Sequence, residues 1–305
     1  DEAEQKARVM AQWRRLPREA CFLYNKLLTG SLRVGVSRGL VERALAELSG
    51  LPRALIARRL MGEFEPGASF FTHLLSEERR EERDGQPYPF FLASPLKDEP
   101  DSLGPLSDWQ ARWKWDGIRI QIVGTGTETR LYSRAGDDIS GSFPEIAAAF
   151  AGHAVLDGEL LVKGEFQGGE AASFNALQQR LGRKAVTTRM MEDYPAFVRL
   201  YDLLIDGEED LRALPWHQRR ARLEGFVPTL DPHRFDLSQL IEASDFEALA
   251  DIRAGARDAA IEGVMLKRRD SPYVPGRKAA LWYKWKRDPL TADCVMMYAQ
   301  RGHGK

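Results

Sequence analysis

Trp113-Lys114-Trp115-Asp116-Gly117-Ile118-Arg119 is the stretch around which the chain is organised. A lysine lies among aromatic residues and is followed by Asp-Gly and then by an arginine. Lysine is a poor nucleophile at neutral pH and becomes a good one only where its surroundings favour the free amine. Without such surroundings, Lys114 is a solvated surface lysine and Asp116-Gly117 is a plain hairpin turn. A role for Lys114 as a nucleophile therefore requires other residues of the chain to supply surroundings that favour its free amine.

Composition sets the broad class of the chain. With 305 residues, 43% hydrophobic and 29% charged, we expect a soluble globular protein of about two domains. No apolar run approaches the ~20 residues of a transmembrane helix. The two cysteines are far apart and in unlike contexts, which argues against a disulfide framework or a cysteine zinc site and suits a reducing interior. Residue 1 is not methionine and no signal peptide opens the chain, so we expect the numbering to begin inside a longer protein.

Residues 1 to about 80 are predicted to form short helices. Ser37 is placed to cap a helix that Gly50 ends, Pro52 to open another, and a third is expected after Pro66. The turn 27–36 holds two glycines and the lone Arg33. Its backbone therefore either approaches another molecule closely or makes a tight connection between helices. The charged run 77–89 ends in Gly and Pro, which is typical of a linker.

After the linker the pattern changes to strands interleaved with helices. Residues 118–123 alternate in polarity, which predicts a strand, with 128–134 returning as its hairpin partner. A helix is predicted over 216–226. Further strands are predicted at 155–162 (broken at Asp157-Gly158), 197–204, 263–267, 281–286 and 294–298.

Two glutamates lie at the head of predicted strands. Glu159 follows Asp157-Gly158, and Glu262-Gly263 repeats the arrangement before an apolar run. Mg²⁺ binds through one or two carboxylates together with phosphate oxygens. The pair is therefore a candidate magnesium site, although each glutamate taken singly is typical of a solvated turn.

Two lysines share one face of the predicted strand 281–286. Because successive side chains of a strand point to opposite faces, Lys284 and Lys286 lie on one face and Tyr283 and Trp285 on the other. The two cations, about 6–7 Å apart, repel each other unless an anion such as phosphate lies over them. The alternative is an edge strand protected by lysines. Tyr201, at the end of another strand, is either a core aromatic or a ring on which a base stacks.

Together these residues resemble the covalent nucleotidyltransferases, and most closely the ATP-dependent DNA ligases. The turn 27–35 resembles part of the helical DNA-binding domain found in many such ligases, which capping enzymes and most RNA ligases lack. Six motifs occur in the family's order: Lys-x-Asp-Gly-x-Arg (114–119), Ser-Arg-x-Gly (133–136), Asp-Gly-Glu (157–159), aromatic-Asp (201–202), Glu-Gly-x-Met-x-Lys (262–267) and Lys-x-Lys (284–286).

The resemblance implies an α+β fold in three parts. An N-terminal all-α DNA-binding domain would cover residues 1–88. A nucleotidyltransferase (adenylation) domain of mainly antiparallel sheets flanked by helices would cover 89–289, and the start of a truncated OB-fold domain 290–305. The family's last motif, a basic segment that orients the pyrophosphate of ATP, is absent from the sequence.

The resemblance also implies roles for individual residues. Lys114 would be the nucleophile that accepts AMP from ATP, and Glu159 and Glu262 would hold Mg²⁺ or Mn²⁺. Arg33 and Arg134 would contact nicked duplex DNA, Arg134 at the 5′-phosphate. The nucleotide site would comprise Arg112, Trp113, Arg119 (ribose or nick terminus), Arg134, Glu159, Tyr201 (adenine), Glu262, Lys284 and Lys286 (both at the α-phosphate).

The implied function is an ATP-dependent DNA ligase that seals nicks between a 5′-phosphate and a 3′-hydroxyl through a lysyl-AMP intermediate and a DNA-adenylate. An RNA ligase or a capping-type guanylyltransferase shares the lysine chemistry and stays open as an alternative. So does a non-catalytic module that binds nicked DNA. We expect a monomer without membrane association, in a bacterial cytoplasm or a eukaryotic nucleus.

Overall fold

The computed structural model divides the chain into two compact units, one of residues 1–56 and 75–77 and the other of residues 57–74 and 78–305. The described residues are 2–30, 35–61, 67–76, 85–164, 171–172, 174–181, 183, 186–256, 260–288, 293, 295 and 298. None of the helices in this described part is long and apolar enough to span a membrane.

In the described residues before Ser76, every regular element is a helix. Ser37 accepts a hydrogen bond from the amide of Leu40 at the start of α3, and Gly50, with φ +72°, ends that helix. The helices predicted after Pro52 and Pro66 are also present, which confirms the sequence-based prediction for this part. The elements are α1 (Glu2–Arg15), α2 (Arg18–Leu28), α3 (Arg38–Ser49), α4 (Arg53–Arg59) and α5 (Ala68–Leu74).

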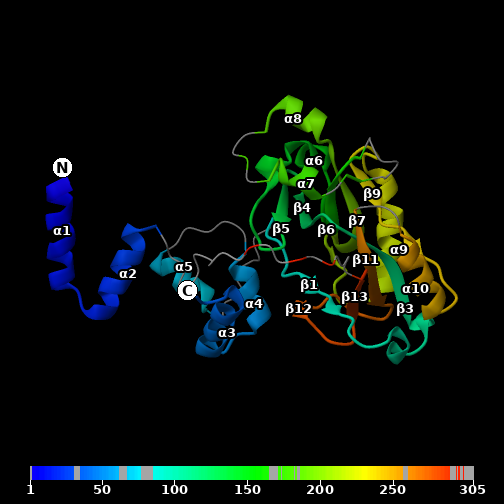
Figure 1. Cartoon of the computed structure of the whole chain (residues 1–305), viewed down its shortest axis with the longest axis horizontal. Coiled ribbons are helices and arrows are strands. Elements are labelled where there is room, and N and C mark those ends of the chain that lie inside the picture. The colour runs from blue at the N-terminus through cyan, green and yellow to red at the C-terminus, as the bar shows by residue number, and fades with distance from the viewer. Residues whose placement is uncertain are drawn as a thin grey trace. The chain divides into compact units, whose positions relative to one another are not determined.

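Lys114 lies in a five-stranded sheet. Its strand order is β10-β3-β11-β13-β2, antiparallel except for the parallel pair β13–β2. Three of its strands, β3, β11 and β13, are labelled in Figure 1. The strand β13 lies between two neighbours, so the interpretation of its lysines as guards of an edge strand is wrong. The strands are β2 (Ser94–Pro95), β3 (Trp109–Trp115), β10 (Leu240–Ile241), β11 (Ile261–Arg268) and β13 (Trp282–Lys286).

A six-stranded sheet forms the second layer. The predicted hairpin of β4 with β5 is confirmed. The predicted break at Asp157-Gly158 is wrong, because β6 continues through these residues and absorbs the irregularity as a register shift against β7. The strands in order are β5 (Thr129–Ser133), β4 (Ile118–Thr125), β6 (His153–Val162), β7 (Ala196–Asp206) and β8 (Glu209–Asp210), with β9 (Phe235–Leu237) parallel to β7.

Short elements complete this unit. The helix predicted over 216–226 is confirmed as α9. A short parallel pair of strands joins residues 91–92 to residues 276–277. These elements are β1 (Phe91–Leu92), β12 (Gly276–Arg277), α6 (Pro144–Ala149), α7 (Phe174–Gln178), α8 (Thr188–Asp193), α9 (Trp216–Phe226), α10 (Phe246–Gly255) and the 3₁₀ turns η1 (Pro100–Leu103), η2 (Leu106–Asp108), η3 (Ser140–Ser142) and η4 (Val227–Thr229).

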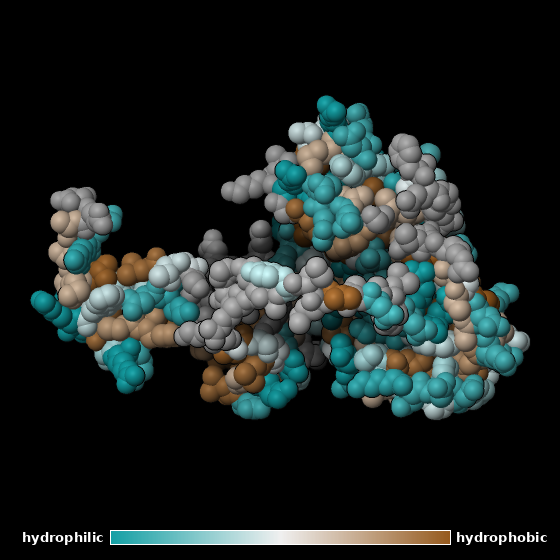
Figure 2. All heavy atoms as spheres, in the orientation of Figure 1, coloured by the Kyte–Doolittle hydropathy of each residue, from teal (hydrophilic) through white to brown (hydrophobic). Residues whose placement is uncertain are grey.

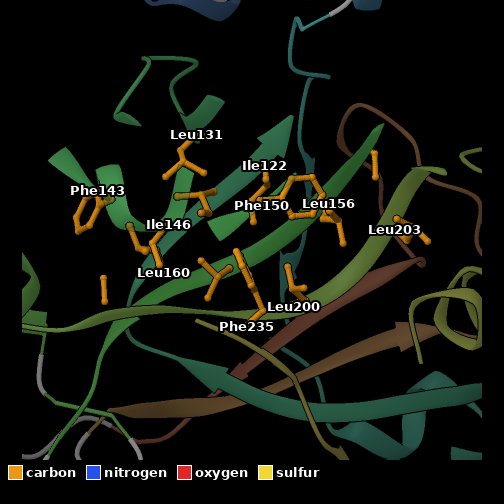
Figure 3. Packing of buried hydrophobic residues seen from close by; sticks show 14 of the residues in the cluster. Ile122, Leu131, Phe143, Ile146, Phe150, Leu156, Leu160, Leu200, Leu203 and Phe235 are labelled. Carbon is orange, nitrogen blue, oxygen red and sulfur yellow. The ribbon is translucent and has the colours of Figure 1, made fainter. Parts of the chain in front are cut away.

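Each sheet buries one apolar face. Alternate residues of β4, β6 and β7, among them Ile122, Leu160 and Leu200, pack with Ile146 of α6 (Figure 3). The five-stranded sheet buries Trp109, Ala111, Val264 and Leu266 with Phe246 and Leu249 of α10. Strand side chains alternate between faces. In the five-stranded sheet the other face carries polar residues, whereas the other face of the six-stranded sheet is also packed, with Val123, Val155 and Leu204 beside Trp216 of α9.

Hydrophobic side chains also lie on the surface of the N-terminal helices. Helix α2 has no buried residue and exposes Phe22, Leu23, Leu27 and Leu28. Brown surface is visible over the N-terminal helices in Figure 2.

Candidate functional site

Four cations on the polar face of the five-stranded sheet lie in two rows. Strand pairing aligns Lys114 of β3 with Gly263 of β11 and Lys286 of β13, and in the same way Arg112 with Lys284 through β11. Paired residues of neighbouring strands point to the same face. The predicted common face of the two lysines is therefore confirmed, and it also carries Arg112 and Lys114.

Trp113 lies on the opposite face of β3. It packs there, half-buried, beside the cluster of Trp109, Val264 and Leu266. The structure thus places this predicted nucleotide-site residue beneath the site rather than among the four cations.

Glu262 reaches the cations through an irregularity in its strand. The register of β11 against β3 shifts between Ile261 and Gly263, and the carboxylate of Glu262 forms ion pairs with Lys114 and, at 3.3 Å, with Lys286. Burial alone would raise the pKa of Glu262, but Lys114, the hydrogen bond with Asp116 and the charge of Lys286 together outweigh it and hold that pKa below its ordinary value. Lys114 is therefore a paired residue with a 23% exposed side chain, not a freely solvated surface lysine.

Gly263 makes this close approach feasible. Its φ is +148°, and a Cβ there would lie 2.3 Å from the carbonyl oxygen of Trp285 and 2.7 Å from Cα of Lys286. Both atoms belong to the backbone of β13 and cannot be displaced by a rotamer change. A residue without a side chain is therefore needed between Lys114 and Lys286.

Asp116 is a second acid at the lysine that the sequence interpretation treated as part of a turn. Its pKa is raised, first by burial and then by a hydrogen bond to Glu262 and the negative charge of that residue. Its amide donates to the carbonyl of Ala260, at 2.6 Å. Asp116 and Glu262 thus form a pair of acids beside the Lys114 amine, in which the pKa of Asp116 is raised and that of Glu262 is lowered.

The six-stranded sheet contributes Glu159. Strand pairing places Glu159 beside Arg119 of β4 and Arg199 of β7. Burial raises the pKa of Glu159 to about 7, against the opposing charges of Lys114, Arg112 and Arg119. Glu159 of one sheet thus lies close enough to the Lys114 amine of the other sheet for the two charges to interact.

Arg119 is held by a buried hydrogen-bond network. Its guanidinium donates to Asp157 at 2.7 Å and to the carbonyl of Phe91 at 2.6 Å, while its Nε is buried without a partner in the described residues. Asp157, fully buried, also accepts hydrogen bonds from Gln121 and Tyr273. The Arg119 guanidinium was predicted to contact a ribose or the nick terminus. Part of it instead holds the backbone at Phe91, the first residue of β1.

Tyr201 and Asp202 are consecutive and yet both meet residues of the five-stranded sheet. Pairing of β6 with β7 joins Gly158 to Leu200 and Asp157 to Asp202, which leaves Tyr201 as the extra residue of a β-bulge. Tyr201 is 1% exposed, with the guanidinium of Arg112 3.9 Å from the centre of its ring.

Asp202 joins a buried charge cluster that the sequence interpretation missed. It accepts hydrogen bonds from Arg219 at 2.8 and 3.1 Å and from Lys267 at 3.3 Å, all three side chains being almost wholly buried. Burial favours the neutral acid, but the charges of Arg219 and Lys267 outweigh it, so the pKa of Asp202 is lowered. The ammonium of Lys267 lies 3.8 Å from the ring centre of Trp282.

Arg134 and Arg277 add to the positive potential of the site. Burial, and then the charges of Lys286, Arg277, Lys114 and Arg134, lower the pKa of Lys284. Arg134 is exposed in the turn between β5 and the following segment, where Ser133 Oγ accepts from the amides of Ala135 and Asp137. A surface that gathers cations in this way suits an anion such as phosphate. Arg33, the other predicted DNA contact, lies outside the described residues.

The carboxylates suit a hard divalent cation. Oε2 of Glu262 is buried and lacks a well-directed hydrogen bond, although two ammonium groups lie within ion-pair distance. Within the described part of the chain, no group of three or more His, Cys, Asp or Glu side chains forms a ready-made metal site. Glu159 and Glu262 therefore fit Mg²⁺ or Mn²⁺ only together with oxygens of a phosphate, as Mg²⁺ commonly binds.

Comparison with known proteins gives a consistent result. The sequence profile of the ATP dependent DNA ligase domain matches residues 91–286. A probable DNA ligase of Koribacter versatilis is 31% identical over 92% of this chain and 52% of its own length. DNA ligase 1 of Korarchaeum cryptofilum is 31% identical over 95% of this chain and 52% of its own length. The chain thus spans about half the length of these relatives.

Solved structures agree with the sequence comparisons. The ligase domain from M. tuberculosis LigD is 30% identical, with a TM-score of 0.51 over 65% of this chain and 60% of that chain. A mycobacterial DNA ligase D complexed with ATP and MES is 29% identical, with a TM-score of 0.50 over the same shares. The pair of antiparallel sheets flanked by helices is the arrangement that these comparisons match.

Proposed function

Because this chain belongs to the ATP-dependent DNA ligase family, we propose that it serves the sealing of 5′-phosphate/3′-hydroxyl nicks in duplex DNA through a lysyl-AMP intermediate. The observation that carries the proposal is the setting of Lys114. Its amine contacts the Glu262 carboxylate and shares a sheet face with Lys284 and Lys286.

In the first transfer, the lone pair of Lys114 Nζ attacks the α-phosphorus of ATP. A P–N bond forms, the bond to the bridging oxygen breaks, and pyrophosphate leaves with that electron pair. The proton that Nζ must lose has a carboxylate acceptor in contact, Glu262. Such transfers need in-line positioning and charge neutralisation more than covalent help from other groups.

Cations of the site would neutralise the phosphate. Lys284 and Lys286 lie two residues apart on the Lys114 face, which suits contacts with the α-phosphate. Glu159 and Glu262 would hold Mg²⁺ or Mn²⁺, which supplies Lewis-acid charge neutralisation when bound. We assign the adenine ring to Tyr201 and the ribose to the Arg119 side of the site.

The two later transfers use the same lysine as a leaving group. An oxygen of the 5′-phosphate at the nick attacks the phosphorus of lysyl-AMP, the P–N bond breaks, and Lys114 regains a proton. The 3′-hydroxyl then attacks the 5′-phosphate, loses its proton, and releases AMP. Arg134, exposed near Lys284, is the residue that we assign to the 5′-phosphate.

The division of labour along the chain is part of the proposal. We assign residues 1–88 to a helical DNA-binding domain with Arg33 on the duplex, 89–289 to adenylation, and 290–305 to the start of an OB-fold. We also propose that the protein acts as a monomer, in a cytoplasm or nucleus.

Two assays test the function separately. Intact-mass measurement after incubation with ATP and Mg²⁺ should show an added AMP that is lost in Lys114→Ala. A Lys114→Ala protein that still gains AMP would refute the nucleophile. Sealing of a pre-adenylated nick bypasses ATP. We expect it to proceed on DNA and to be weaker on an all-RNA duplex, whereas the reverse preference would favour the RNA-ligase alternative. Binding of the nick with neither sealing nor AMP transfer would favour the non-catalytic module.

A further inference from the structure

Arg112 is a buried cation without an ion-pair partner in the described part of the chain. The residue is 5% exposed, its Nη1 donates only to the carbonyl oxygen of Trp113 at 3.2 Å, and its Nε is buried without a partner. Burying a charge without a counter-ion is costly. The remaining donors therefore point to a ligand that accepts hydrogen bonds.

Other stacked arginines of the same unit show what Arg112 lacks. Arg199 lies 4.2 Å from the ring centre of Trp115 and is bonded twofold to Asp236. Arg212 lies 3.8 Å from the ring centre of Tyr88 and is bonded twofold to Asp210. Both are structural arginines with satisfied charges. Arg112 has the same stacking on Tyr201 but no carboxylate in ion-pair contact among the described residues.

The position of Arg112 identifies the part of the ligand that it meets. Arg112 and Lys114 are two residues apart on one strand, so their side chains emerge about 6–7 Å apart on the same face. The guanidinium covers the ring of Tyr201, to which we have assigned the base of the nucleotide. A base that stacks on this face of the ring must displace the guanidinium toward the edge of the base.

A guanidinium at the edge of a purine is selective. Arginine offers five N–H donors and no acceptor. The O6 and N7 atoms of a 6-oxopurine are adjacent acceptors that pair twofold with arginine. Adenine instead presents an N6 donor beside N7, a pattern that suits asparagine or glutamine.

We propose that Arg112 selects the base of the nucleotide that reacts with Lys114, and that the site accepts 6-oxopurine nucleotides, ITP and GTP, as well as ATP. The proposal rests on the function proposed above. It assigns Arg112 to the edge of the base and Tyr201 to its face.

The test compares nucleotides rather than absolute activities. The 305-residue protein is incubated with Mg²⁺ and with ATP, ITP or GTP, and the yield of lysyl-nucleotide is measured by intact mass. Calorimetric binding of AMP and IMP provides a second measurement that does not require the reaction. Arg112→Gln replaces the donor fork with an amide that matches adenine. We expect the ITP/ATP and IMP/AMP ratios to fall on the order of tenfold.

Matched variants keep the result interpretable. Arg212→Gln makes the same substitution at an arginine stacked on another tyrosine and should leave both ratios unchanged. Arg112→Lys keeps the charge without the planar fork and should give intermediate ratios, and it replaces Arg112→Gln if the latter does not fold. Unchanged ratios in a folded Arg112 variant would overturn the base-selecting role, even with lysyl-AMP intact. If ATP gives no lysyl-AMP and neither AMP nor IMP binds, the proposed function fails and this proposal with it.

Discussion

Nζ of Lys286 lies 3.3 Å from Oε2 of Glu262, the carboxylate oxygen that also contacts Lys114. One carboxylate thus holds two ammonium groups from the strands on either side of β11. The arrangement ties Lys114, the proposed nucleophile, to Lys286, one of the two lysines assigned to the α-phosphate, because neither amine can move without changing the charge balance at the other.

Glu262→Gln should separate catalysis from stability. The amide cannot accept the Lys114 proton, so we expect lysyl-AMP formation to slow about 100-fold or more. Gln keeps the size of Glu, and of the two ion pairs that are lost, the one with the exposed Lys286 contributes only about 0–1 kcal/mol to folding. The fall in the melting temperature should therefore be small beside the loss of rate. Glu224→Gln, which removes a carboxylate paired with Arg220 on α9, is the control and should leave the rate unchanged.

Lys284→Ala should reduce lysyl-AMP formation by at least about tenfold, because it removes a cation assigned to the α-phosphate. Urea unfolding should show little change, since the lysine has no ion pair among the described residues. Lys278→Ala removes a neighbouring exposed cation and serves as the matched control. A large loss of stability with normal lysyl-AMP formation would show that Lys284 is structural.

The pKa of Glu159, raised by burial to about 7 from an ordinary 4.5, makes stability depend on pH. The folded protein binds this proton more tightly than the unfolded chain, so its stability decreases as pH rises from about 4.5 to about 7. Glu159→Gln removes this dependence. We expect the melting temperature of the variant, relative to the parent, to rise across that interval and then level off. A constant difference from pH 4 to 8 would contradict the raised pKa.

Gly263→Ala should destabilise the protein by about 2–3 kcal/mol, because the new methyl group meets the backbone of β13 in a strained conformation. Chemical denaturation measures the change. Gly225→Ala in the exposed part of α9, where a Cβ meets nothing within 4 Å, should instead stabilise by about 0.5–1 kcal/mol. Equal effects of the two substitutions would show that the β11–β13 contact tolerates a side chain.

Asp202→Asn should cost about 3–5 kcal/mol, because it leaves Arg219 and Lys267 buried without a counter-charge. The lowered pKa of Asp202 implies that its contribution is present at neutral pH and is lost as pH falls through that pKa. Urea unfolding at pH 7 measures the change, and an effect below 1 kcal/mol would show that the cluster contributes little to folding.

Local patterns of the sequence predicted much of this fold. The cap at Ser37, the hairpin of β4 with β5, helix α9 and the two faces of β13 each follow from residues close together in the chain. The strand β3 was not predicted, although alternation of Trp109, Ala111 and Trp113 with polar residues was visible.

The bulges and the buried networks could not be predicted in the same way. The orientation of Tyr201 depends on a register shift between β6 and β7. The position of the Glu262 carboxylate depends on a register shift between β11 and β3. Asp157, Lys267 and Asp116 gain their partners from strands or segments distant in sequence. Each of these contacts depends on how two segments distant in sequence come together, which the sequence of either segment alone does not show.

The pairing of residues 91–95 has a consequence for synthesis of the protein. This segment precedes most strands of the sheets in the chain, yet it pairs in parallel with residues 276–277 and 283–284, which belong to the last two strands of the described part of the chain. The neighbours of β3 likewise arise far later than β3 itself. The sheet that holds Lys114 therefore stays open on the ribosome until β13 has emerged, and contacts so distant in sequence form slowly. A nascent chain of this protein therefore contains Lys114 long before the strands that complete the proposed site around it have been made.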